Sequence, residues 1–161
     1  MIPNILGIDL GSSGIKLIYS TEDGNTKVRA EYEEISPKGW YEALCRVAKE
    51  FDLSKVKAIG LSSQVGTYII NGKDNTSWSL QVGQEELEEV LSMETQEVFM
   101  QEISMPHPHI LSYPLPRLNY FKKKYGTLTD VCMQKDYLIE KLTGNRVSDP
   151  FSWRGLANLE T

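Results

Sequence analysis

A carboxylate stands beside a glycine- and serine-rich loop in residues 6–16, which read LGIDLGSSGIK. The loop from Gly11 to Gly14 can offer backbone N–H groups and hydroxyls to a phosphate, because glycine adopts positive φ and allows close approach. Asp9 alone would repel that phosphate. A Mg²⁺ ion between them would remove the conflict, since Mg²⁺ is usually held by one or two carboxylates together with substrate phosphates. The segment therefore predicts a metal–nucleotide site, and the alternative is a hairpin turn in which Asp9 merely ends a strand.

Two familiar phosphate loops do not fit these residues. A P-loop requires Gly-Lys-Ser/Thr at the start of a helix, whereas Lys16 follows Ile15 and leads into an apolar run typical of a strand. Gly7, Gly11 and Gly14 also lack the spacing of a dinucleotide fingerprint, and no helix follows them. The pattern that remains is strand, phosphate-contacting turn, strand.

The elements that would position this loop indicate an α/β fold with a mixed sheet. Strands are predicted at 5–9, 15–20 and 26–34, and Asp23-Gly24 is a hairpin signal between the last two. Short turns of this kind predict an antiparallel three-strand meander.

A helix and a further strand follow the meander. Ser36-Pro37 can begin a helix that ends near Phe51, with apolar residues at helical spacing on one face. The run Val56–Leu61 is typical of a buried strand, and the helix before it implies that it joins the sheet in parallel. The predicted order is therefore β-β-β-α-β.

The second half of the chain gives weaker signals. Asn71-Gly72 predicts another hairpin. Helices are predicted over Arg117–Tyr125 and Lys135–Leu142, and Gly144 suits the C-cap of the second one. We expect these elements to complete one domain over residues 1–161.

Two clusters of polar residues suggest metal binding but are better explained otherwise. Four glutamates between residues 85 and 89 surround apolar positions, which is typical of a solvated amphipathic helix. His107 and His109 lie among prolines, and no third ligand has a fitting spacing, so we expect a proline-stiffened loop.

The composition favours an ordinary cytoplasmic domain. The chain has 161 residues, 40% of them hydrophobic, and a net charge of −5. No apolar run is long enough for a membrane span, the N-terminus lacks a signal-peptide pattern, and no basic stripe beyond Lys122–Lys124 indicates a nucleic-acid partner. Cys45 and Cys132 fall in separate helix-like segments without CxxC spacing, so we expect free thiols in a reducing compartment.

Four stretches in order resemble the FGGY family of carbohydrate kinases, the xylulokinase, gluconokinase and glycerol kinase types. LGIDLGSSGIKLIYS is similar to the family's first phosphate motif, and VKAIGLSSQVGTYII to a strand and loop of its sugar site. QKDYLIEKLTG resembles the family's PKDYL…LTG helix, and Asp149 falls where a Thr-Asp pair commonly follows that helix. The resemblance covers nearly the whole chain and implies a ribonuclease-H-like lobe of the actin–hexokinase type.

The resemblance also implies roles for individual residues. Asp9 would hold Mg²⁺ through water, and Gly11, Ser12 and Ser13 would face the β- and γ-phosphates of ATP. The site for the sugar or polyol would be lined by residues at the ends of two strands or just after them, namely Ser63, Gln64, Val65 and Trp78. Without the resemblance, Gln64 is equally well explained as a loop-capping side chain. A homodimer is a further expectation.

Several positions depart from the family pattern. Val65-Gly66 replaces side chains that help to position substrate, and Leu80 and Val82 stand where the family has charged residues after Trp78. Pro150, Phe151 and Trp153 replace small residues. The phosphate side therefore resembles the family closely, while the sugar side is altered.

Two functions remain open on the sequence alone. The chain fits the N-terminal part of a sugar kinase, with the catalytic base and the adenosine pocket expected after Thr161. The alternative is a non-catalytic sugar- or nucleotide-sensing module of the same fold.

Overall fold

The structure is a computed structural model that describes residues 3–72, 74–104, 110–154 and 156. The chain divides into two compact units. Unit 1 comprises Met1–Gln64 and Gln134–Arg146, and unit 2 comprises Val65–Met133 and Val147–Thr161. Each unit has a hydrophobic cluster of its own and is described by itself. The assignment of residues 1–161 to one kinase lobe stays a prediction.

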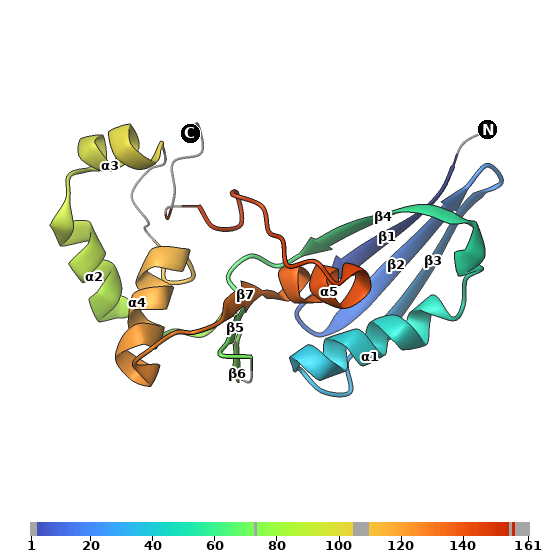
Figure 1. Cartoon of the computed structure of the whole chain (residues 1–161), viewed down its shortest axis with the longest axis horizontal. Helices are drawn as coiled ribbons and strands as arrows, with labels where there is room; N and C mark the ends of the chain where they lie inside the picture. Colours follow the sequence, from blue (N-terminus) through green and yellow to red (C-terminus); the bar gives the residue numbers. More distant parts are fainter. Residues whose placement is uncertain (1–2, 73, 105–109, 155, 157–161) are drawn as a thin grey trace. The chain divides into compact units, whose positions relative to one another are not determined.

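Unit 1 is built on a four-stranded mixed sheet with the order β3-β2-β1-β4 (Figure 1). Its strands are β1 (Asn4–Leu10), β2 (Gly14–Thr21), β3 (Gly24–Glu31) and β4 (Val56–Ser63). The first three pair antiparallel, and β4 pairs parallel to β1, which confirms the predicted meander and parallel strand. β3 ends at Glu31 rather than at residue 34, because Glu31 lies opposite Gly14, where its partner strand begins.

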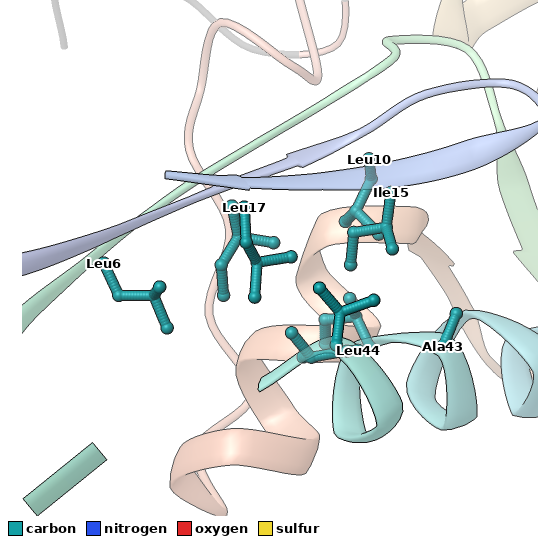
Figure 2. Packing of buried hydrophobic residues seen from close by; sticks show 9 residues of the cluster. Leu6, Leu10, Ile15, Leu17, Ala43 and Leu44 are labelled. Carbon is teal, nitrogen blue, oxygen red and sulfur yellow. The ribbon is translucent and has the colours of Figure 1, made fainter. Parts of the chain in front are cut away.

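One face of this sheet packs against α1 (Pro37–Ala48) and α5 (Gln134–Thr143). Alternating apolar residues of β1 and β2 form this inner face, and Figure 2 shows them pointing from the sheet toward α1. The fully or nearly fully buried members of the cluster include Leu6, Ile8, Leu10, Ile15, Leu17, Leu44 and Leu138. Since burying one such side chain contributes about 1.5–3 kcal/mol, this cluster stabilises the sheet on its inner face.

The helix α1 begins where the sequence predicts. The hydroxyl of Ser36 accepts a hydrogen bond from the N–H of Gly39 at 3.1 Å, and a proline occupies the first turn. α1 ends at Ala48 rather than near Phe51. Phe51 instead closes a turn, with its N–H donating to the carbonyl of Ala48, and its ring packs on Tyr19 with 5.3 Å between ring centroids. A short 3₁₀ turn, η1 (Leu53–Lys55), leads into β4.

Loss of this cap gives a first testable result. We expect Ser36→Ala to lower the free energy of unfolding by about 1 kcal/mol, because an N–H at the start of α1 loses its acceptor. Urea denaturation followed by far-UV circular dichroism measures the change. Ser92→Ala is the control, since that exposed hydroxyl only donates to the carbonyl of Glu89 in its own helix. An equal loss in both variants would show that Ser36 does not act as a cap.

The described residues of unit 2 form a small sheet and three helices. The sheet order is β6-β5-β7, with β5 (Tyr68–Ile70), β6 (Asp74–Thr76) and β7 (Val131–Met133) all antiparallel. The helices are α2 (Gln84–Met93), α3 (Gln96–Ile103) and α4 (Pro114–Tyr125). The core of the unit is formed by Tyr68, Ile70, Phe121 and Met133.

The predicted hairpin at Asn71-Gly72 is confirmed. Both residues have positive φ, 51° and 69°, which asparagine and glycine tolerate best. The side-chain carbonyl of Asn71 also accepts a hydrogen bond from the N–H of Thr129 at 3.0 Å, while its backbone N–H donates to Asp130. The turn is thereby tied to the residues that lead into β7.

Other predictions for the second half are confirmed in part. α5 and its C-cap at Gly144 lie where the sequence places them. α4 begins at Pro114 rather than at Arg117, since proline needs no N–H partner at the first helical position. Cys132 lies in β7 and not in a helix, and it forms no disulfide with Cys45 of α1.

The glutamate-rich segment forms α2, as predicted, but one of its carboxylates is buried. Glu86 is only 5% exposed and lies 3.1 Å from the Nζ of Lys123 on α4, which also contacts Glu89 at 2.7 Å. These pairs hold α2 against α4. His107 and His109 lie outside the described residues. Within residues 3–72, 74–104, 110–154 and 156, no group of three or more His, Cys, Asp or Glu side chains could hold a metal.

The lengths and compositions of the described helices show whether any of them could cross a membrane. None of them combines the length and the apolar character that crossing a bilayer requires.

Candidate functional site

Asp9 lies on the outer face of the unit 1 sheet, at the carboxyl end of β1. Lys16 on β2 and Ser62 on β4 lie directly opposite it in the two strand pairings. The hydroxyl of Ser62 donates to Oδ1 of Asp9 at 3.0 Å, and Nζ of Lys16 lies 3.6 Å from Oδ2. The Asp9 side chain is 51% exposed, so its carboxylate is held in place but open to a ligand.

These three side chains border a shallow hollow of about 350 Å³ in the outer face. Its floor contains Gly7 and Gly60, which pair directly across β1 and β4. Because neither residue has a side chain, the sheet surface beside the carboxylate stays open.

The loop after β1 uses its carbonyl groups within the protein. The carbonyl of Gly14 accepts from the N–H of Gly11 at 2.9 Å, and that of Ser13 accepts from the N–H of Tyr32 at 3.1 Å. The carbonyl of Gly11 accepts from the Tyr32 hydroxyl at 3.2 Å. Ser12 and Ser13 are exposed, and their N–H groups donate no hydrogen bond within the described part of the chain. The N–H groups of Ser12 and Ser13 can therefore donate to an anion.

The glycines of this loop are needed for space and not for positive φ. Neither Gly11 nor Gly14 adopts a left-handed backbone, contrary to the sequence-based expectation. A Cβ on Gly14 would lie 2.5 Å from the carbonyl oxygen of Ala30, which no real Cβ tolerates. Glycine at position 14 thus allows β3 to pass close to the loop.

Tyr32 links the loop to Asp9 electrostatically. Burial raises the pKa of its phenol well above the ordinary value, the charge of Asp9 raises it further, and a hydrogen bond with Gln134 opposes both. The phenol therefore stays protonated and acts as a donor to Gly11 rather than as a base. Ser62 and Tyr32 were not among the predicted site residues. The alternation along residues 56–63, matched to the end of β1, is the signal that could have identified Ser62.

The four predicted sugar-site residues fall in both units. Ser63, the last residue of β4, and Gln64 belong to unit 1, whereas Val65 and Trp78 belong to unit 2. The expectation that they share one wall of a cleft therefore stays a prediction. The hydroxyl of Ser63 makes only a long 3.5 Å contact with the carbonyl of Gln64.

The residue next to Val65 explains one departure from the family pattern. Gly66 has a φ of 89°, and a Cβ there would lie 2.9 Å from Cβ of Ser112 and 3.3 Å from Cβ of Trp78. Space for a side chain at this position is already occupied. Trp78 itself follows β6 and is 46% exposed.

Asp149, the last residue of the resemblance, has a local structural role. Its carboxylate accepts hydrogen bonds from the N–H of Ser152 at 2.9 Å and from the Ser152 hydroxyl at 2.7 Å. It thus stabilises the turn that begins at this position.

Comparison with known proteins places these features in a family context. No family model matches the chain. Xylulose kinase of Staphylococcus xylosus is 24% identical over 175 residues, covering 91% of this chain and 35% of that protein. The chain thus spans about a third of the length of this relative.

Solved structures show the same fold. Ligand-bound xylulose kinase and gluconate kinase, both from Lactobacillus acidophilus, each superpose with a TM-score of 0.77 at 19% identity. They cover 99% and 100% of this chain, which spans 38% of each of them. Plasmodium falciparum glycerol kinase with ADP has a TM-score of 0.68 at 19% identity, with coverage of 99% and 38%.

These likenesses confirm the predicted ribonuclease-H-like α/β fold of the actin–hexokinase type. The chain is similar in sequence to a xylulose kinase and in fold to xylulose, gluconate and glycerol kinases, which confirms the predicted resemblance to the FGGY carbohydrate kinases.

Proposed function

We propose that the chain is the phosphate- and sugar-binding N-terminal part of an ATP-dependent carbohydrate kinase, which transfers a γ-phosphoryl group to a sugar or polyol hydroxyl. The observation that carries the proposal is the outer-face arrangement of Asp9 beside exposed N–H donors of Ser12 and Ser13. The names of the relatives, xylulose, gluconate and glycerol kinase, support the reaction class. One of these structures was solved with ADP, which supports nucleotide use.

The residues present fit a Mg²⁺–nucleotide complex. Asp9 offers a hard, half-exposed carboxylate beside a hollow, and a single carboxylate suffices where phosphates and water complete the coordination. Lys16, whose Nζ lies 3.6 Å from Oδ2 of Asp9, would add positive charge to a site that binds phosphates. When bound, Mg²⁺ would neutralise charge that develops on the transferred phosphoryl group.

The protein groups then have distinct tasks. The hydroxyl of Ser62 fixes the rotamer of Asp9. The hydroxyl of Tyr32 donates a hydrogen bond to the carbonyl of Gly11 and so holds the loop that presents Ser12 and Ser13. No carboxylate of this hollow remains for deprotonating the sugar hydroxyl, because Asp9 is assigned to the metal. We therefore place the catalytic base after Thr161, consistent with a chain that spans 35% of its xylulose kinase relative.

A sensing module without catalysis is the second candidate function. It is favoured by the departures from the family pattern: Leu80, which stands where the family has a charged residue, is 42% exposed, and Val65 and the retained Trp78 are 38% and 46% exposed. Such an apolar surface can bind a sugar without the polar groups that orient it for phosphoryl transfer.

A coupled ADP-release assay distinguishes the two functions. We expect the purified 161-residue chain to fold but to show no sugar-dependent turnover with ketoses, aldoses and polyols. The reason is that in-line transfer needs an acceptor for the hydroxyl proton and closure over the nucleotide. The same assay on a polypeptide that also contains any coding sequence downstream of Thr161 should show turnover with at least one sugar.

Two outcomes would contradict this assignment. Sugar-dependent turnover by the 161-residue chain would place the base within it and remove the reason for assigning Asp9 to the metal. Absence of turnover by both polypeptides, together with sugar-induced changes in Trp fluorescence, would favour the sensing module.

A further inference from the structure

Arg117 is a fully buried cation in the first turns of α4, with 0% of its surface exposed. Its Nη2 donates to the carbonyl of Leu80 at 2.9 Å, and its Nε donates to the carbonyl of Leu111 at 3.1 Å. No carboxylate of the described residues pairs with it, and its Nη1 is buried without a hydrogen-bond partner. Burial accordingly lowers the pKa of the guanidinium, an effect that Tyr68 and Tyr120 only partly offset.

A buried charge without an ion pair contributes little to stability. Desolvating a charge costs several kcal/mol, and apolar residues often replace buried ionic groups without loss of stability. The guanidinium therefore contributes to the structure through its hydrogen bonds to two carbonyl groups and not through an ion pair. A planar fork bridges two chain segments with a fixed geometry, which the rotatable ammonium of a lysine on its flexible stem does not impose.

The segment that Arg117 holds is the turn that contains Trp78. The N–H of Leu80 donates to the carbonyl of Ser77 at 3.1 Å, which closes the turn 77–80. Arg117 binds the carbonyl at the end of this turn and joins it to Leu111, ahead of α4.

The turn also packs against Gly66. As described above, Gly66 leaves no space for a Cβ between Ser112 and Cβ of Trp78. The carbonyl of Ser112 in turn accepts from the buried hydroxyl of Tyr68 at 3.1 Å. The turn is thus held by Arg117 at Leu80 and packs on Gly66 at Cβ of Trp78, while Trp78 itself stays 46% exposed.

We propose that Arg117 is a positioning residue for sugar recognition, which holds the turn 77–80 so that the indole of Trp78 is presented as a flat apolar surface. The ligand class that this surface fits is a sugar or polyol with an apolar C–H face. The inference rests on the proposed carbohydrate-binding function. The alternative is that Arg117 only stabilises the core of unit 2.

Fluorine NMR of the chain labelled with 5-fluorotryptophan tests the positioning directly. The Trp78 signal is assigned by its loss in Trp78→Phe, and Trp40 and Trp153 report on the folding of units 1 and 2. In Arg117→Lys we expect the Trp78 signal to broaden or split, while the other two signals keep their positions. Arg117→Gln, a second variant without the fork, should behave in the same way.

Arg46→Lys is the matched control. Arg46 also donates to a backbone carbonyl, that of Glu31 at 2.8 Å, but it is exposed and lies in unit 1. We expect it to leave the Trp78 signal unchanged. An unchanged Trp78 signal in both Arg117 variants would overturn the proposal. A shift of the Trp153 signal in both variants would also overturn it, since Arg117 would then stabilise the core of unit 2.

A kinetic measurement on the catalytically active polypeptide completes the test. Arg117→Lys should raise KM for the sugar about tenfold and change kcat less than threefold. The variant weakens binding of the sugar in the ground state but leaves the phosphate-binding residues unchanged. A fall in kcat at constant KM would contradict the proposal. If the wild-type polypeptide turns over no sugar, the proposed function fails, whereas the NMR signal still shows whether Arg117 positions Trp78.

Discussion

Asp9→Asn should lower kcat of the active kinase by about 100-fold, the scale typical of removing one group that stabilises transition-state charge. The amide keeps the shape of the side chain and can still accept the hydrogen bond from Ser62. It loses the negative charge that would attract Mg²⁺ beside the phosphates. The KM for sugar should change little, because Asp9 makes no part of the proposed sugar surface. Steady-state kinetics with separate titrations of sugar and Mg²⁺–ATP measure both quantities.

Two controls separate charge from geometry in this experiment. Asp23→Asn removes a carboxylate from the hairpin at the other end of the meander and should leave kcat unchanged. Ser62→Ala removes the 3.0 Å hydrogen bond but keeps the charge of Asp9, so it should lower kcat much less than Asp9→Asn. If kcat of Asp9→Asn stays within a few-fold of wild type, Asp9 is only a strand-end residue.

The first half of the chain could be predicted closely because its strands contain apolar runs that are separated by clear turn and helix-start signals. Asp9 was identified for the same reason, since it follows an apolar run and precedes a turn. Ser62 was missed because two serines end β4. Only the register with β1 shows that Ser62, and not Ser63, lies opposite Asp9.

The second half was predicted less well for different physical reasons. Each strand of unit 2 has three residues, too few for a periodic pattern, so that Cys132 was assigned to a helix. The prolines before Arg117 were interpreted as a loop, although Pro114 starts the helix. The contact of Arg117 with Leu80 joins residues 37 positions apart, and no local pattern encodes such a contact.

The glycines show how a correct identification can rest on an incorrect reason. Gly11 and Gly14 were expected to need positive φ, and neither has it. What distinguishes Gly14 is its buried position beside the backbone of β3. The atoms that leave no space for a side chain there belong to Ala30, 16 residues later in the chain. Steric demands of this kind are visible only once the strands are paired.

Gly14→Ala should therefore destabilise unit 1 strongly. The new Cβ would lie 2.5 Å from the Ala30 oxygen and 3.2 Å from Cα of Glu31, and both are backbone atoms that cannot rotate away. β2 and β3 would have to separate at the end beside the Gly11–Gly14 loop, and the carbonyl of Gly14 would lose its hydrogen bond from the N–H of Gly11. We expect the free energy of unfolding to fall by about 3 kcal/mol, the upper end of typical overpacking costs.

The matched variant Gly60→Ala adds the same methyl group to β4 of the same sheet, where nothing lies within 4 Å of the new Cβ. Its stability should stay within about 0.5 kcal/mol of wild type. Urea denaturation followed through the buried Trp40 of α1 compares the two variants in the same unit. Nucleotide affinity should also fall in Gly14→Ala even where the protein remains folded, because the N–H groups of Ser12 and Ser13 are carried by the displaced loop. Equal stability of both alanine variants would mean that β3 does not pass this close to Gly14, and the fixed loop geometry on which phosphate binding depends would lose its support.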